Sequence, residues 1–96
     1  MFIITVTYKK PMEEIEPHMD AHMAFVKKQF ADGHFLFSGR KVPRTGGIIV
    51  SNIRTREQLD DIIKQDPFDR HQLADFDVIE FSVTTTCGEL EILKEL

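Results

Sequence analysis

The sequence has few of the residues that cross-link a chain or anchor it in a membrane. Cys87 is the only cysteine among 96 residues, so no intramolecular disulfide can form. No apolar run approaches the ~20 residues that a membrane-spanning helix needs. The first residues alternate in polarity and carry no basic leader, unlike a secretory signal peptide. We therefore expect a cytoplasmic protein that has no membrane partner.

Basic residues and polar aromatic side chains are also scarce. The 12 Lys and Arg residues are outnumbered by 16 Asp and Glu, which gives a formal net charge of −4. Nucleic acid is normally bound by a concentrated basic surface, so we expect no nucleic-acid partner. There are 8 Phe against one Tyr and no Trp, and Phe offers apolar area without a polar group. These rings are expected in a core, an interface or an apolar pocket.

The periodicity of apolar residues changes several times along the chain. Residues 2–8 alternate with the period of a strand, whereas from about residue 13 to 32 apolar side chains recur every three or four positions, as in a helix. Turn residues and capping residues delimit the later segments. The predicted elements are strand 2–8, helix 13–32, strands 34–42 and 46–53, helix 55–64 and strand 75–83.

This order is β-α-β-β-α-β, the pattern of ferredoxin-like α+β folds. It predicts a four-stranded antiparallel sheet in a single domain over residues 1–96, with a C-terminal tail from about 84 to 96. Helices would cover one face of the sheet. The other face is expected to present a mixture of apolar and polar side chains: Ile3, Thr5, Thr7, Leu36, Ser38 and Arg40. Such a face suits a second copy that encloses a small pocket, so we predict a homodimer or a larger homo-oligomer.

His22 interrupts the apolar stripe of the first predicted helix between Met19 and Val26, and should therefore face inward. A buried imidazole needs hydrogen-bond partners, because an unsatisfied polar group costs roughly 1–3 kcal/mol. His22 is either a structural histidine bonded to the backbone or a general base whose second ring nitrogen is oriented by a carboxylate. The periodicity alone favours the structural role.

Asp66 is the candidate for that carboxylate. It precedes Pro67, and Asp-Pro is a common start of a short helix, with Asp as N-cap and Pro as first helical residue. Spacing alone therefore favours a capping role. The two roles use the same oxygens but do not exclude each other.

A metal site is the weaker interpretation of the histidines. His18 and His22 lie four residues apart, a spacing that can place two ligands on one helix face. The residues between them do not complete an HExxH motif, and a third ligand would have to come from elsewhere, for example His34 or His71. We therefore expect no metal.

Ser38, Gly39 and Arg40 are candidate substrate-binding residues at the end of the predicted strand 34–42. Gly39 allows close approach of a ligand or a neighbouring backbone, and Arg40 suits an anionic group such as a carboxylate. A strand bulge followed by an exposed arginine is an equally good interpretation. The basic run 40–44 is interpreted first as a solvated hairpin end. The chain has no glycine-rich phosphate loop and no nucleophile elbow, and we expect no cofactor.

Together these features resemble the YciI-like family over residues 2 to about 83. The most specific feature is the order of His22, Gly39 and the Asp-Pro-Phe sequence that ends at Phe68. The other features are the first strand 2–6, the stretch 33–39 with glycine at both ends, and the glycine pair 46–47.

The resemblance implies a dimeric α+β barrel built from ferredoxin-like domains. It also implies that His22 and Asp66 form a dyad in a pocket, with Phe68 among the substrate-binding residues. The chemistry suggested for the family is proton abstraction in eliminations or isomerisations of small, often aromatic-derived molecules. This chain departs from the family where Gly39 is followed by Arg40 instead of Pro, and where Met19 replaces an Arg one turn before the histidine.

Two functional hypotheses follow. In the first, the protein is a cofactor-independent lyase or isomerase in which His22 is the general base and then the acid. Asp66 would orient His22, and Ser38 or Arg40 would hold a small, cyclic, anionic ligand. In the second, the protein is a non-catalytic ligand-binding or assembly module, and the pair of His22 and Asp66 is a structural hydrogen bond.

Overall fold

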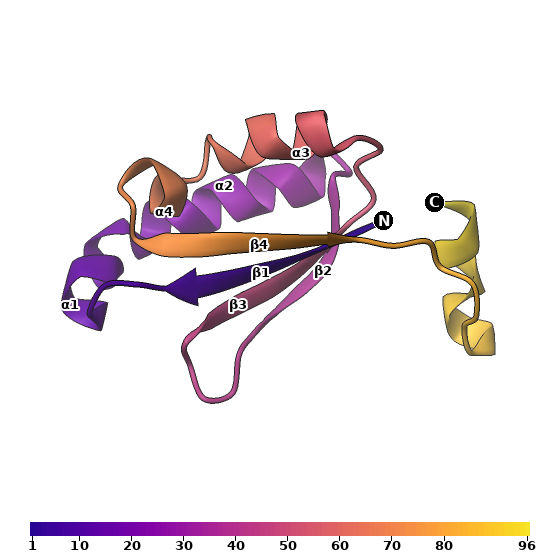
Figure 1. The fold of residues 1–96 in the computed structure, drawn as a ribbon, viewed down its shortest axis with the longest axis horizontal. Coiled ribbons are helices and arrows are strands. Elements are labelled where there is room, and N and C mark those ends of the chain that lie inside the picture. Colours follow the sequence, from indigo (N-terminus) through magenta and orange to yellow (C-terminus); the bar gives the residue numbers. More distant parts are fainter.

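The alternating N-terminal segment becomes a central strand of a four-stranded antiparallel sheet, in a computed structural model that describes residues 1–96 (Figure 1). The strand order is β2-β3-β1-β4, and the helices lie on one face of the sheet. This arrangement confirms the predicted ferredoxin-like α+β fold. The strands are β1 (Phe2–Tyr8), β2 (Phe35–Arg40), β3 (Gly46–Ser51) and β4 (Ala74–Glu80). The helices are α1 (Met12–Ile15), α2 (Met19–Ala31), α3 (Arg56–Ile63) and α4 (Pro67–Arg70), with 3₁₀ turns η1 (Glu16–His18) and η2 (Gly88–Glu95).

The core lies between the sheet and the helices. Phe2, Ile4 and Val6 occupy alternate positions of β1 and are 0–3% exposed. The side chains on this side of the strand therefore face the helices, as the alternation in the sequence predicts. They belong to a cluster of 12 buried residues to which every layer contributes. The helical members of that cluster are Ile15, Val26, Leu59 and Phe68.

The first predicted helix is divided in two at Pro17. Proline has no backbone N–H to donate, and the chain passes through η1 there before α2 begins at Met19. The predicted end of the helix is correct. Gly33 has a φ of +79°, and its N–H donates to the Phe30 carbonyl while the His34 N–H donates to the Gln29 carbonyl. These two bonds form a Schellman C-cap.

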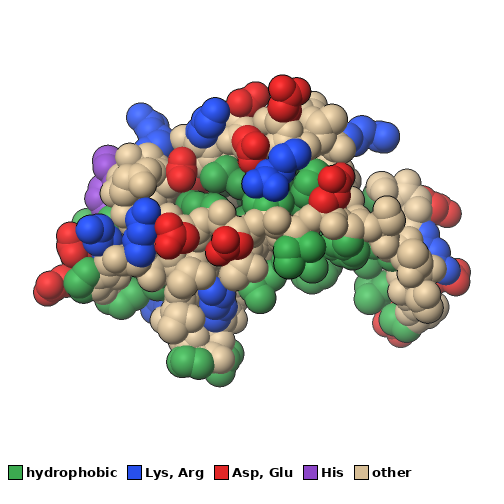
Figure 2. Space-filling view, in the orientation of Figure 1, with side chains coloured by type: hydrophobic (Ala, Val, Ile, Leu, Met, Phe, Trp, Pro, Cys, Tyr) green, Lys and Arg blue, Asp and Glu red, His purple; other side chains and the backbone are tan.

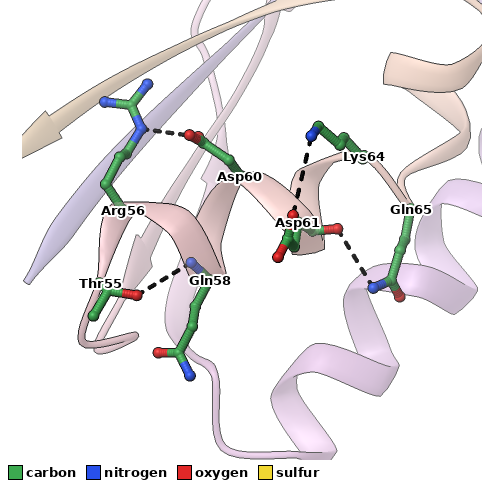
Figure 3. Close-up of polar contacts among 7 residues, drawn as sticks. All are labelled: Thr55, Arg56, Gln58, Asp60, Asp61, Lys64 and Gln65. Atoms are coloured by element: carbon green, nitrogen blue, oxygen red, sulfur yellow. Dashed lines mark hydrogen bonds and ion pairs between the residues drawn. The ribbon is translucent and has the colours of Figure 1, made fainter.

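Helix α3 begins with the cap predicted at Thr55. The Thr55 hydroxyl accepts the Gln58 N–H at 3.2 Å, and Arg56 forms an ion pair with Asp60 one turn later at 2.9 Å (Figure 3). These contacts lie on the exposed side of the helix. The opposite side carries the fully buried Leu59 against the sheet.

Strand β2 contains a β-bulge, and beyond it the side chains lie on the opposite face of the sheet from the one that simple alternation predicts. The register with β3 shifts between Phe35 and Phe37, and beyond the shift Ser38 pairs with Ile49, a residue of the core cluster. The prediction that Ser38 and Arg40 lie on the face away from the helices was therefore wrong. The extra residue of the bulge reverses the alternation and places both residues on the helix side.

The sheet face away from the helices is not covered by a helix in the single chain. It is mixed, as expected: Thr5 lies on it opposite Asp77, next to a group of apolar residues. Phe37, Ile48 and Ile79 lie on it and are 55%, 42% and 60% exposed. Ile3 and Val50 are cross-strand neighbours on the same face. Figure 2 shows hydrophobic side chains gathered below the sheet, on the side opposite the helices. We name Ile3, Phe37, Ile48, Val50 and Ile79 the open face.

The C-terminal segment stands apart from the sheet (Figure 1). Strand β4 ends at Glu80, three residues before its predicted end, and no hydrogen bond joins residues 84–96 to the rest of the chain. Leu90, Ile92 and Leu96 are about half exposed or more, at 49%, 62% and 52%. No helix in the structure is both long enough and apolar enough to cross a membrane.

Replacing Gly46 by alanine is expected to destabilise the fold. Gly46 has a φ of +150°, and a Cβ there would lie 1.8 Å from the carbonyl oxygen of Val6. The strained backbone alone costs about 1–3 kcal/mol, which lowers the melting temperature of a domain this size by roughly 4–8 °C per kcal/mol. Gly39→Ala is the matched control, because a Cβ at Gly39 meets no atom within 4 Å. Equal melting temperatures for the two variants would contradict the expectation.

Candidate active site

His22 on α2 and Asp66 at the start of α4 are brought together by the packing of the two helices. The Nδ1 atom of His22 lies 2.8 Å from Oδ1 and 3.0 Å from Oδ2 of Asp66. The side chains are 13% and 1% exposed, respectively. A carboxylate only accepts hydrogen bonds, so the Nδ1–H of His22 is the donor. In the neutral imidazole, the Nε2 atom then carries the free lone pair.

Asp66 also caps α4, as the Asp-Pro sequence suggested. Its Oδ1 accepts the Phe68 N–H at 2.9 Å, and Pro67 occupies the first helical position, where no amide donor is needed. One carboxylate therefore holds the first turn of α4 and the imidazole of α2. The cap fixes the direction in which the oxygens point.

Phe68 fixes the plane of the imidazole. Its ring stacks on that of His22 with a centroid distance of 3.9 Å and an interplanar angle of 1°. Tyr8 packs edge-on against Phe68, with the centroids 5.9 Å apart and the planes at 85°. The stack sets the tilt of the His22 ring, and the bonds to Asp66 set its rotation within that plane. The direction of Nε2 is thus determined by two independent contacts, and Nε2 itself bonds to no protein atom.

A cavity of about 430 Å³ lies beside His22, between α2 and the β2–β3 hairpin. Its volume is within the ~300–1,000 Å³ range of small-molecule sites. The structure places every residue predicted to bind substrate in its wall: Ser38, Gly39, Arg40 and Phe68. The α2 side of the wall adds the largely apolar side chains Met19, Met23 and Val26.

The cavity also has lining residues that the sequence pattern did not reveal. Arg44 belongs to the basic run 40–44, for which the sequence predicts a solvated hairpin end, and for Tyr8 the sequence predicts only a place in the first strand. The available signals were the position of Tyr8 on the same side of β1 as Val6, and the nearness of Arg44 to Arg40 along the chain. Neither signal shows whether the residue lines a cavity or faces solvent, because that depends on how the hairpin packs.

The remaining histidines do not join His22. The rings of His18 and His71 lie against each other with a centroid distance of 4.2 Å and a tilt of 34°, and His34 bonds through Nδ1 to the Gln29 side chain at 2.7 Å. No group of three or more His, Cys, Asp or Glu side chains is arranged to hold a metal ion. Although His18 and His22 are four residues apart, their imidazoles contact different partners, His71 and Asp66 respectively.

Comparison with known families matches residues 1–82 to the YCII-related domain. Comparison with curated proteins gives no match to this sequence. A similar solved structure is the 5-chloro-2-hydroxyhydroquinone dehydrochlorinase TftG from Burkholderia phenoliruptrix AC1100, in complex with 2,5-dihydroxybenzoquinone. The TM-score is 0.70 at 15% sequence identity, and the match covers 85% of this chain and 94% of that one. A likeness at this identity is a likeness of fold.

The protonated nitrogen of His22 can be identified by long-range ¹H–¹⁵N correlation NMR. In the native protein the neutral ring is expected as the Nδ1–H tautomer, because both oxygens of Asp66 accept from that atom. Asp66→Asn replaces one of the two acceptors by a donor, while the remaining oxygen can still cap α4. The population of the Nε2–H tautomer should therefore rise in the variant. A dominant Nε2–H tautomer in the native protein would contradict this geometry.

Proposed function

The chain belongs to the YCII-related domain family, and from this premise we propose that it is an enzyme in which His22 is a general base toward a small organic molecule. The observation that carries the proposal is the oriented imidazole beside a cavity of about 430 Å³. The reaction is an elimination or an isomerisation that starts with removal of a proton from carbon. It needs only groups that the chain itself supplies.

In the proposed reaction, Nε2 of His22 takes the proton and the ring becomes an imidazolium. The carboxylate of Asp66, which accepts Nδ1–H at 2.8 Å, stabilises that positive charge and keeps Nε2 directed at the substrate. The electron pair left on carbon either expels a leaving group or moves through a double bond. The imidazolium then returns its proton to the leaving group or to a different substrate atom, which restores neutral His22.

The surroundings of the pair support this role. Asp66 is nearly inaccessible to water, so its interaction with an imidazolium is weakly screened. Ser38 and Arg40 lie across the cavity and offer a hydroxyl and a guanidinium to a substrate. TftG, which has the same fold, is a dehydrochlorinase of a small cyclic molecule. It therefore gives a precedent for an elimination by a protein of this fold.

The proposal is tested by deuterium exchange in D₂O, followed by proton NMR, with a set of small cyclic ketones that carry acidic C–H bonds. For a compound that the native protein exchanges or converts, His22→Gln should slow the rate by about 100- to 10,000-fold, the usual contribution of a general base. Glutamine keeps a polar side chain of similar reach but cannot accept and return a proton in this way.

Thermal unfolding of the same variant separates the enzyme from the non-catalytic alternative. In the enzyme, His22→Gln loses exchange while it stays folded at the assay temperature. In a ligand-binding or assembly module, no compound exchanges in the native protein, and the variant shows mainly a lower melting temperature. The second outcome would make the His22–Asp66 contact a structural bond between α2 and α4.

We also propose that two copies of the chain pair through the open face. The helices cover only the opposite side of the sheet (Figure 1), and Phe37, Ile48 and Ile79 are each at least 42% exposed in the single chain. Such contiguous apolar surface is typical of an interface. The exposed apolar side chains of the tail, Leu90 and Ile92, offer further surface to a partner.

Sedimentation velocity at micromolar concentration should show a dimer or a larger homo-oligomer. Ile79→Lys should raise the dissociation constant by roughly 10–100-fold, since it buries an unpaired ammonium in the interface. Ala24→Lys adds the same charge to the exposed side of α2 and should leave the dissociation constant unchanged. A native protein that sediments as a monomer would refute the pairing.

A further inference from the structure

The cavity beside His22 has charges of one sign only. None of the 16 Asp and Glu residues is among its lining residues, whereas Arg40 and Arg44 both are. The carboxylate of Asp66, which bonds to the lining residue His22, is 1% exposed and also accepts from the Phe68 N–H. It is therefore not free to neutralise an arginine across the cavity.

The two hairpin arginines have no acidic partner, unlike the lysines and arginines that form ion pairs elsewhere in the chain. Lys28 and Arg56, for example, lie within 2.9 Å of an aspartate oxygen. Arg40 and Arg44 form no ion pair and no side-chain hydrogen bond. Because the chain as a whole has a net charge of −4, two unpaired guanidinium groups make this cavity a local positive region on a negative molecule.

The structure also separates the charged part of the cavity from its apolar part. Arg40 lies opposite Gly47 in the β2–β3 ladder, so no side chain of β3 occupies the space next to it. Arg44 lies in the loop 41–45 that joins β2 to β3 in the same hairpin. The wall on the α2 side consists of His22 and of the apolar residues Met19, Met23 and Val26. An occupant that matches both sides has a charged end toward the hairpin and an apolar body against α2.

We propose that this cavity selects small cyclic carboxylates, with Arg44 and Arg40 binding the carboxylate group and α2 contacting the ring. Arginine suits this task because its planar guanidinium donates two parallel hydrogen bonds to a carboxylate. Arg44 is then a specificity-determining residue that the basic run 40–44 did not reveal as such. The inference rests on the proposed function only in taking the cavity as the substrate site, and it requires no turnover.

Benzoate and benzamide are suitable probes, because they have nearly the same shape and differ in charge. In ¹H–¹⁵N NMR titrations, benzoate should shift the amide resonances of Gly39 and Gly47 and bind at least about tenfold more tightly than benzamide. Arg44→Gln and Arg40→Gln should each remove most of that preference, because they should weaken the binding of benzoate much more than that of benzamide. Both arginines lie at the hairpin without protein partners, so the variants should melt like the native protein.

Arg54→Gln is the matched control, since Arg54 is exposed, forms no ion pair and lies outside this cavity. It should keep the full preference for benzoate. Equal binding of the two probes, no shift with benzoate, or an equal loss in Arg54→Gln would each overturn the proposal. If benzoate is preferred but no compound exchanges deuterium, the proposal that the arginines bind carboxylates is supported and the proposal that the protein is an enzyme is refuted. Exchange without a preference for anions would support the enzyme and refute the proposal about the arginines.

Discussion

The site depends on the hydrogen bonds that one buried carboxylate, that of Asp66, accepts. A carboxylate removed from water is strongly destabilising unless it accepts hydrogen bonds. Asp66 accepts hydrogen bonds from two donors, the Phe68 N–H and the Nδ1–H of His22. The first holds the start of α4 and the second joins α4 to α2. Because the cap places Phe68 directly after Asp66 and Pro67, the same turn provides the ring that stacks on the imidazole. Removal of both oxygens of this side chain would release the capped turn, the tautomer and the ring orientation together.

The two interpretations of Asp66 that the sequence left open are therefore not alternatives. Capping uses Oδ1, and both oxygens remain within reach of Nδ1 of His22. The structural role and the proposed chemical role thus use the same atoms, and loss of stability on removing Asp66 would not argue against catalysis. The two roles differ in what they require of Nε2, the ring nitrogen of His22 that does not contact Asp66. A purely structural histidine has no need of a free Nε2 beside a cavity, whereas a general base does.

The sequence predicted the order of elements because the strands, helices and caps each leave a local signal. Thr55, Gly33 and Asp66 all occupy the terminal positions that their residue types favour. It did not predict the bulge in β2, because the run from Phe35 to Phe37 is apolar throughout and shows no alternation that an extra residue would disturb. Nor did it place Arg44 in the cavity. A charged hairpin residue looks solvated until the long-range pairing of its strands is known, and that pairing depends on the bulge.

The bulge connects the two surfaces on which the proposed functions depend. Beyond the shift, Phe37 lies on the open face, whereas Ser38 and Arg40 lie on the helix side. Without the extra residue the alternation would be inverted: Phe37 would point into the space beneath the helices, and Arg40 would leave the cavity for the open face. An unpaired guanidinium would then stand where a second copy is proposed to pack, at the cost of burying a charge. One additional residue in an edge strand thus keeps the apolar surface and the cationic cavity on opposite sides of the sheet, so pairing through one leaves the other accessible to a ligand.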